Sequence, residues 1–173
     1  TDRLILRPYA ATDYEESAAV WADPEVVRYI GDPATREQSW FRTLRYIGHW
    51  AAFGFGMWAV RDHAGRFVGD VGITDHKRAL DPPLTALEAG WVLAPWAHGR
   101  GLATEAVAAA IEWFERTQGA QDIACMIDPP NAPSRRVAAK HGFLEERRAV
   151  YHDAEVIIFI RPSRPARLLA GTD

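Results

Sequence analysis

Residues 90–114 read GWVLAPWAHGRGLATEAVAAAIEWF and carry the strongest structural signal in the chain. The first six residues are an apolar run closed by Pro95, which is typical of a buried strand. Two glycines then flank Arg100, and from Leu102 onward apolar residues recur with the three- and four-residue spacing of one helix face. The stretch is therefore predicted to form a strand, a glycine-rich turn and a helix.

The glycine-rich turn indicates an anion-binding site. A helix N-terminus leaves its first backbone N–H groups unpaired, and the helix dipole places partial positive charge at the same end. Glycine residues also let the backbone approach a ligand closely. We therefore expect the turn to bind a phosphate or a pyrophosphate.

The elements around this stretch define the fold class. Their order, β-α-α-α-β-β-β-α-β-α-β-β, predicts one α+β domain at 1–161, with a central, mostly antiparallel mixed sheet, flanking helices and one parallel crossover. A C-terminal tail is expected at 162–173. The expected strands are 3–7, 55–62, 66–74, 87–93, 122–127, 143–151 and 155–160, and the helices are 12–21, 25–30, 35–53, 102–118 and 132–141.

Local signals mark the starts of the N-terminal helices. The residue pairs 12/15 and 35/38 have the spacing of capping boxes, and Asp23 before Pro24 predicts an N-cap. In the strand at 66–74, the interior glycines Gly69 and Gly72 indicate a bulge or a close backbone approach. One apolar side of the third helix consists of Trp40, Leu44, Ile47 and Ala51.

Composition excludes several classes of protein. Hydrophobic residues make up 48% and charged residues 25%, a globular balance, and the net charge of -3 argues against non-specific nucleic-acid binding. No apolar run reaches the roughly 18 residues of a membrane helix, and a signal-peptide core is absent from the sequence start, so we expect a cytoplasmic protein without membrane contact. A single cysteine and six histidines without metal-site spacing predict neither an internal disulfide nor a metal.

Two motifs give the chain a family resemblance. PWAHGRGLATEA at 95–106, followed by NAPSRRVAAKHGF at 131–143, resembles the GNAT superfamily of acyl-CoA N-acyltransferases. Within it, the chain is most similar to the branch of ribosomal-protein N-terminal alanine/serine acetyltransferases. The resemblance extends to RLILRP at 3–8 and to the strand before Pro95. It implies a GNAT-like fold.

The resemblance also implies a site for acetyl-CoA. In the family, backbone N–H groups of the turn bind the coenzyme A pyrophosphate, and the preceding strand binds the pantetheine arm. Asn131 matches a position that holds the pantetheine or the adjacent backbone, and it is also a plain helix N-cap by sequence. His98 departs from the Gln or Arg usual in the family. The implied cofactor-binding residues are Trp91, Val92, Leu93, His98, Gly99, Arg100, Gly101, Leu102, Ala103, Thr104 and Asn131.

Two residues are candidates for acid and base chemistry. Ser134 matches a family position proposed to protonate the leaving thiolate, the alternative being an exposed helix serine. Glu88 is the candidate base for the amine, because relatives of the branch carry an acid at this position. Its alternative is an exposed strand glutamate, and Asp70, Asp75 and His76 are rivals for the role.

Other polar residues near these motifs can be explained by structural roles. Glu105 is interpreted as structural, and Cys125 as a buried small residue rather than a nucleophile. Arg135, Arg136 and Lys140 either reach the 3′-phosphate of coenzyme A or form a solvated helix face.

The expected activity is direct transfer of an acetyl group from acetyl-CoA to a primary amine in a ternary complex. The favoured acceptor is a protein or peptide N-terminal α-amine. The alternatives are a small amine, such as an aminoglycoside, polyamine or amino acid, and a non-catalytic acyl-CoA-binding module. An acidic lining would favour a polyamine and an open groove a peptide. A homodimer is among the expected assemblies.

Overall fold

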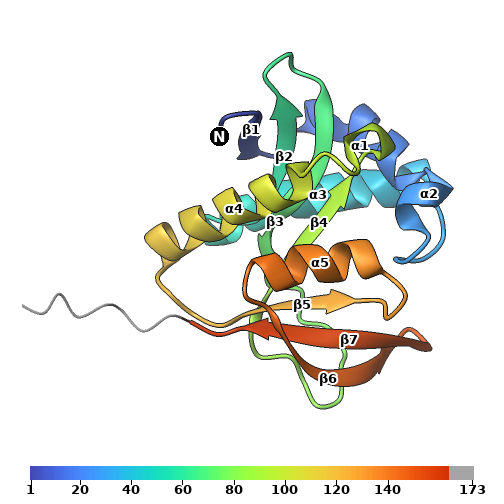
Figure 1. The fold of residues 1–173 in the computed structure, drawn as a ribbon. Helices are drawn as coiled ribbons and strands as arrows, with labels where there is room; N and C mark the ends of the chain where they lie inside the picture. The colour runs from blue at the N-terminus through green and yellow to red at the C-terminus, as the bar shows by residue number, and fades with distance from the viewer. Residues whose placement is uncertain (164–173) are drawn as a thin grey trace, which may run out of the picture.

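A seven-stranded sheet in the order β1-β2-β3-β4-β5-β7-β6 forms the centre of the protein (Figure 1). The structure is a computed structural model that describes residues 1–163, so most of the predicted tail lies outside the described residues. The elements are β1 (Leu4–Pro8), α1 (Tyr14–Trp21), α2 (Pro24–Val27), α3 (Arg36–Phe53), β2 (Met57–Asp62), β3 (Phe67–Thr74), β4 (Leu87–Leu93), α4 (Leu102–Gln118), β5 (Ile123–Ile127), α5 (Ala132–Lys140), β6 (Leu144–Tyr151) and β7 (Ala154–Arg161), with 3-10 turns at Ala11–Asp13 and Pro95–Ala97. This order confirms the predicted α+β fold.

The pairing of β4 with β5 differs from the other pairings in the sheet. All other neighbouring strands are antiparallel, whereas β4 and β5 are parallel and are joined through α4. Their register contains only two residue pairs, Leu87 with Ile123 and Glu88 with Ala124. Beyond Glu88 the two strands are no longer paired. The sheet therefore opens at its centre.

Alternating side chains divide the core between the two faces of the sheet. Trp58 and Val60 of β2 belong to the cluster under α4, whereas Met57 and Ala59 pack with Tyr46 of α3 on the other face. Figure 1 shows α4 and α5 across the near face, with α3 behind the strands. The gap between β4 and β5 is thus bordered by α5 on one face and by α3 on the other.

Two glycines let the central strands approach one another. A Cβ atom at Gly69 would lie 2.1 Å from the Val92 carbonyl oxygen, and one at Gly72 would lie 2.2 Å from the Gly56 oxygen. The β2–β3 register also shifts between Val60 and Arg61, opposite this region. The predicted close approach and bulge are both confirmed. Gly69 therefore fixes the position of β4, which borders the gap.

The N-terminal helices confirm two predicted starts and correct one. The Asp23 carboxylate accepts from the Glu25 N–H, and the capping box at 35/38 is formed. The capping box predicted at 12/15 was wrong, because a 3-10 turn precedes α1. The Asp13 carboxylate instead accepts from the Ala10 N–H and from Arg7.

The ends and faces of these helices also differ from expectation. The second helix was predicted to reach Ile30 and ends at Val27, because the chain turns before Gly31. The apolar side predicted for α3 is not the side that contacts the sheet, since Trp40 and Leu44 are exposed and only Ile47 packs against the core. The buried positions of α3 are Ser39, Thr43, Tyr46 and His49.

Within residues 1–163, no helix combines the length and the apolar character needed to cross a membrane.

Candidate functional site

The divergence of β4 and β5 opens a cavity of about 690 Å³ that is lined from both faces of the sheet. Trp91, Asn131 and Ser134 form what we call the α5 side of this cavity. The α3 side is formed by residues of α1, of α3 and of the segment after α2, and consists of Trp21, Arg28, Asp32, Arg42, Arg45 and Tyr46. A molecule in the cavity can therefore contact both layers of helices through the sheet.

The glycine-rich turn lies between β4 and α4. Gly99 and Gly101 have φ values of 70° and 75°, in the left-handed region that favours glycine. Gly101 is the N-cap of α4, and no described side chain caps this helix. The first N–H groups of α4, from Leu102 to Thr104, therefore lack side-chain partners in the described part of the chain, which is the arrangement that binds phosphates.

Side chains hold this turn in place. The Arg3 guanidinium donates to the Arg100 carbonyl oxygen at 2.9 Å, and the Arg3 N–H donates to the Glu105 carboxylate at 3.0 Å. Glu105 therefore ties β1 to α4, which confirms its structural interpretation. A ring nitrogen of His98 lies 2.9 Å from the Leu93 carbonyl oxygen, so this side chain is directed back toward β4.

The α5 side brings three predicted residues together. The Trp91 indole N–H donates to the Ser134 hydroxyl oxygen at 3.3 Å, and the Asn131 side-chain oxygen accepts from the Ser134 N–H at 3.1 Å. The N-cap role of Asn131 is thus confirmed, and its contact with pantetheine stays a prediction. Because the Ser134 oxygen accepts from Trp91, the hydroxyl hydrogen is free to point into the cavity.

Glu88 lines the cavity and is held by an arginine that the sequence did not indicate. Both carboxylate oxygens of this buried glutamate accept from Arg78, with 2.6 Å between Arg78 Nη2 and Oε1. Arg78 also donates to the Tyr151 hydroxyl at 3.0 Å. This two-point pairing fixes the direction of the carboxylate. Arg78 belongs to the irregular segment between β3 and β4, where no periodicity signals a role.

The rival bases occupy different surroundings. His76 lines the cavity, and burial lowers its pKa to about 4, so the imidazole is neutral at pH 7. The Asp75 carboxylate pairs with Lys77 at 2.8 Å and is not among the residues that line the cavity. Asp70 is fully buried in β3, where it is in register with Val92 of β4. Of the three rivals, only His76 therefore has access to a bound molecule.

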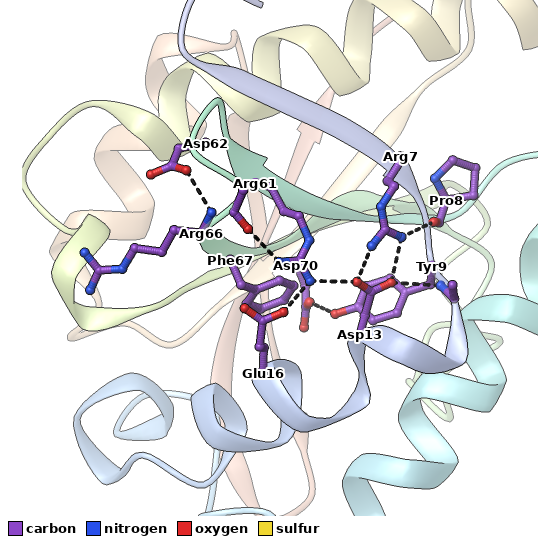
Figure 2. A network of polar contacts seen from close by, with 12 residues as sticks. Arg7, Pro8, Tyr9, Asp13, Glu16, Arg61, Asp62, Arg66, Phe67 and Asp70 are labelled. Atoms are coloured by element: carbon purple, nitrogen blue, oxygen red, sulfur yellow. Dashed lines mark hydrogen bonds and ion pairs between the residues drawn. The ribbon is translucent and has the colours of Figure 1, made fainter.

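Asp70 anchors a buried polar network instead. Its carboxylate accepts from the Tyr9 hydroxyl and, at 2.5 Å, from the Trp21 indole N–H. Figure 2 shows the Tyr9 hydroxyl directed at Asp70, beside the Asp13 carboxylate on which Arg7 and Arg61 converge. Burial raises the pKa of Asp70 to about 6, against the opposite effect of these hydrogen bonds.

The network extends to the cavity through Trp21. The Arg42 guanidinium lies over the Trp21 ring, 3.6 Å from its centroid. Sequence reasoning missed this arrangement because its members come from α1, α3, β3 and the segment after β1, and no short motif connects them.

Cys125 agrees with its interpretation as a buried small residue, whereas the role of the three cations of α5 stays a prediction. Cys125 is buried in β5, and burial raises the pKa of its thiol, which disfavours the nucleophilic thiolate. Arg135, Arg136 and Lys140 are exposed on α5. Among the described residues, no group of three or more His, Cys, Asp or Glu side chains is arranged to hold a metal ion.

Comparison with known proteins gives one family. The model of the acetyltransferase (GNAT) domain matches residues 3–144. The uncharacterized protein YkkB of Bacillus subtilis (strain 168) is 28% identical over 149 residues, which is 82% of this chain and 82% of YkkB.

Solved structures share the fold over almost the whole chain. An acetyltransferase from Agrobacterium tumefaciens str. C58 is 27% identical with a TM-score of 0.80, covering 92% of this chain and 91% of that chain. The ribosomal L7/L12 alpha-N-protein acetyltransferase in complex with coenzyme A is 14% identical with a TM-score of 0.77, covering 94% of this chain and 96% of that chain.

Proposed function

The chain belongs to the acetyltransferase (GNAT) family, and on that premise we propose that it transfers an acetyl group from acetyl-CoA to a primary amine in a ternary complex. The observation that carries the proposal is the cavity between β4 and β5, which connects the two faces of the sheet. Donor and acceptor can enter such a cavity from opposite sides and meet at its centre. Direct transfer requires this kind of meeting point.

The residues present fit coenzyme A. The turn at 98–104 offers N–H groups at an uncapped helix N-terminus for the pyrophosphate, with Arg100 as a neighbouring cation. Beyond Glu88, β4 has no pairing with β5, so its backbone from Trp91 to Leu93 can bind the amide groups of pantetheine. When bound, acetyl-CoA supplies the activated thioester.

Glu88 acts as the general base and Ser134 as the general acid in the proposed reaction. An ammonium group must lose a proton before it attacks, and Glu88 accepts that proton directly or through water. The new bond joins the amine nitrogen to the acetyl carbon, and the carbon–sulfur bond breaks. Ser134 donates a proton to the departing thiolate and recovers one from the nitrogen through solvent. Arg78 acts as a positioning residue for Glu88.

The favoured acceptor is a protein or peptide N-terminal α-amine, with a small amine as the second candidate. Support comes from the resemblance of the two motifs to the ribosomal-protein N-terminal branch. The acceptor occupies the α3 side of the cavity in this proposal, since the α5 side adjoins the pantetheine strand.

An acetylation assay tests the proposed function. The protein is mixed with acetyl-CoA and with a panel of N-terminal peptides, amino acids, polyamines and aminoglycosides. Release of free thiol is followed with a colorimetric reagent, and acetylated product is identified by mass spectrometry. We expect amine-dependent thiol release. Binding of acetyl-CoA without release across the panel would support the non-catalytic module instead.

A further inference from the structure

The α3 side of the cavity contains a guanidinium group that lacks a full set of partners. Arg42 is half-buried, and its Nη1 atom is buried without any hydrogen-bond partner among the described residues. Burial also lowers the pKa of Arg42, although the group stays charged at neutral pH. Arg42 forms no side-chain hydrogen bond or ion pair with the described residues and lines the cavity, so an anion that reaches its remaining N–H groups from the cavity would be favoured.

Trp21 and Asp70 fix the position of the Arg42 guanidinium. It stacks on Trp21 at 3.6 Å from the ring centroid, and the Trp21 indole is hydrogen-bonded to the buried Asp70 carboxylate. Stacking on an aromatic ring leaves the in-plane N–H groups of an arginine free for a planar anion. Arg42 is therefore oriented before any acceptor binds.

The charges around Arg42 make the α3 side cationic. Arg28 and Arg45 are exposed residues that line the same side, against one carboxylate, Asp32. Asp70 carries the nearest buried negative charge, and it lies beneath Trp21 rather than in the cavity lining.

Acidic residues elsewhere in the lining do not offset this excess. Glu88 is paired with Arg78, and Glu155 accepts from Arg148 at 2.6 Å. Asp128 lies between β5 and α5, away from the α3 side. The lining as a whole contains four arginines and four carboxylates, and three of the arginines but only Asp32 of the carboxylates belong to the α3 side.

We propose that the acceptor is an amine that carries a carboxylate, and that Arg42 binds this carboxylate on the α3 side of the cavity. The inference rests on the proposed function and narrows its acceptor. The carboxylate has two sources, an acidic side chain close to a peptide N-terminus or the α-carboxylate of a small amino acid. Polycationic acceptors are disfavoured by like charge.

Matched acceptor pairs test the inference. One pair is two peptides that differ only by Glu or Gln at the second position, and the other is alanine and alaninamide. We expect the carboxylate member of one pair to have kcat/KM higher by about tenfold or more, through KM. The pair that shows the effect identifies the source of the carboxylate. Spermidine is the polycationic comparison.

Variants on α3 assign the effect to Arg42. Arg42→Gln should abolish the preference, and Arg42→Lys should restore part of it because the charge is kept. Arg36→Gln is the matched control, since Arg36 is on the same helix, is exposed and pairs with Glu15 outside the cavity. Calorimetric titration with acetyl-CoA should give similar affinities for all three variants, which shows that they are folded.

The possible outcomes distinguish failure of the inference about Arg42 from failure of the proposed acetyltransferase function. Equal kcat/KM within both pairs, or an unchanged preference in Arg42→Gln, overturns the inference and leaves acetyl transfer standing. Absence of thiol release with every amine overturns the proposed function and the inference with it.

Discussion

The two sides of the cavity present different kinds of groups to a ligand. One set of groups offered to a ligand consists of backbone N–H groups at the start of α4, which lies outside the cavity lining, the free edge of β4 and the hydroxyl of Ser134 on the α5 side. On the α3 side they are long side chains, with Arg42 held by Trp21 and Asp70. Backbone groups are fixed by the fold, whereas side chains change with single substitutions. The comparison suggests that the constant donor is bound by the fold and the acceptor by replaceable side chains.

Substitution at the turn should have the largest effect. Gly101→Val places a β-branched residue at a φ of 75° and puts a side chain where the pyrophosphate approaches. Backbone strain together with the loss of hydrogen bonds to an anion should lower acetyl-CoA affinity by about 100-fold or more. Isothermal titration with acetyl-CoA measures the change.

The opposite end of α4 supplies a matched control. Gly119 has a φ of 84°, and a Cβ atom there meets nothing within 4 Å. Gly119→Val therefore introduces backbone strain at the other end of the helix, away from the turn, and acetyl-CoA affinity should stay near wild type. If both variants bind alike, the turn does not hold the donor, and the proposed backbone role of this region is lost.

The next largest effect is expected at Ser134. Ser134→Ala removes the proposed proton donor for the thiolate and should lower kcat by about 100-fold, with little change in acetyl-CoA affinity. Trp91→Phe keeps the ring but removes the donor to Ser134, so its effect on kcat should be smaller. Steady-state kinetics with thiol detection distinguish the two variants. A wild-type kcat for Ser134→Ala would remove the acid role.

The sequence predicts the glycine-rich turn and the Asn131 N-cap of the α5 side well, because local signals build them. The glycines at 99 and 101, the helix that follows and the Asn131 N-cap each occupy a few consecutive residues, and all are present in the structure. Helix dipoles and capping act within one turn, so short motifs are enough to specify them. The parallel crossover followed from the order of the elements.

The residues of the α3 side and their contacts were not predicted, because long-range contacts create them. Trp21 and Asp70 are 49 positions apart, and Arg78 meets Glu88 from an irregular segment. The apolar pattern of α3 even indicates the wrong side of the helix, because polar residues occupy its buried side. Thr43 can be buried there because its hydroxyl donates to the Ser39 carbonyl oxygen within the helix. Tertiary packing therefore decides which side chains of this region reach the cavity.

Asp70 links the α3 side to the stability of the fold. Its folded pKa of about 6 lies above the ordinary value, so its contribution to stability is present below about pH 4 and is lost as pH rises through 6. Asp70→Asn should remove this decline, which amounts to about 3 kcal/mol at most. The free energy of unfolding in urea at pH 4, 5 and 7 measures it.

The same variant tests whether the network positions Arg42. An asparagine keeps one acceptor for Trp21 but carries no charge, so KM for the acceptor should rise by a few-fold while kcat stays close to wild type. Asp62→Asn, at the β2–β3 turn, is the control and should retain both the pH dependence and the KM. An unchanged KM in Asp70→Asn would mean that Arg42 is held by stacking alone.

The smallest effect is expected at His76, and it decides which group is the base. Burial lowers the pKa of His76 to about 4. The pH profile of kcat/KM near pH 6.5 should therefore be the same in the wild type and in His76→Gln. At pH 7 this variant should keep kcat within about threefold, whereas Glu88→Gln should lose about 100-fold. A greater loss of kcat for His76→Gln would mean that the neutral imidazole accepts the proton of the amine. Glu88 would then only hold Arg78 in place. In that case the base would come from the irregular segment between β3 and β4, which also contains Arg78. Like the residues of the α3 side, it would be positioned by long-range contacts and not by a local motif.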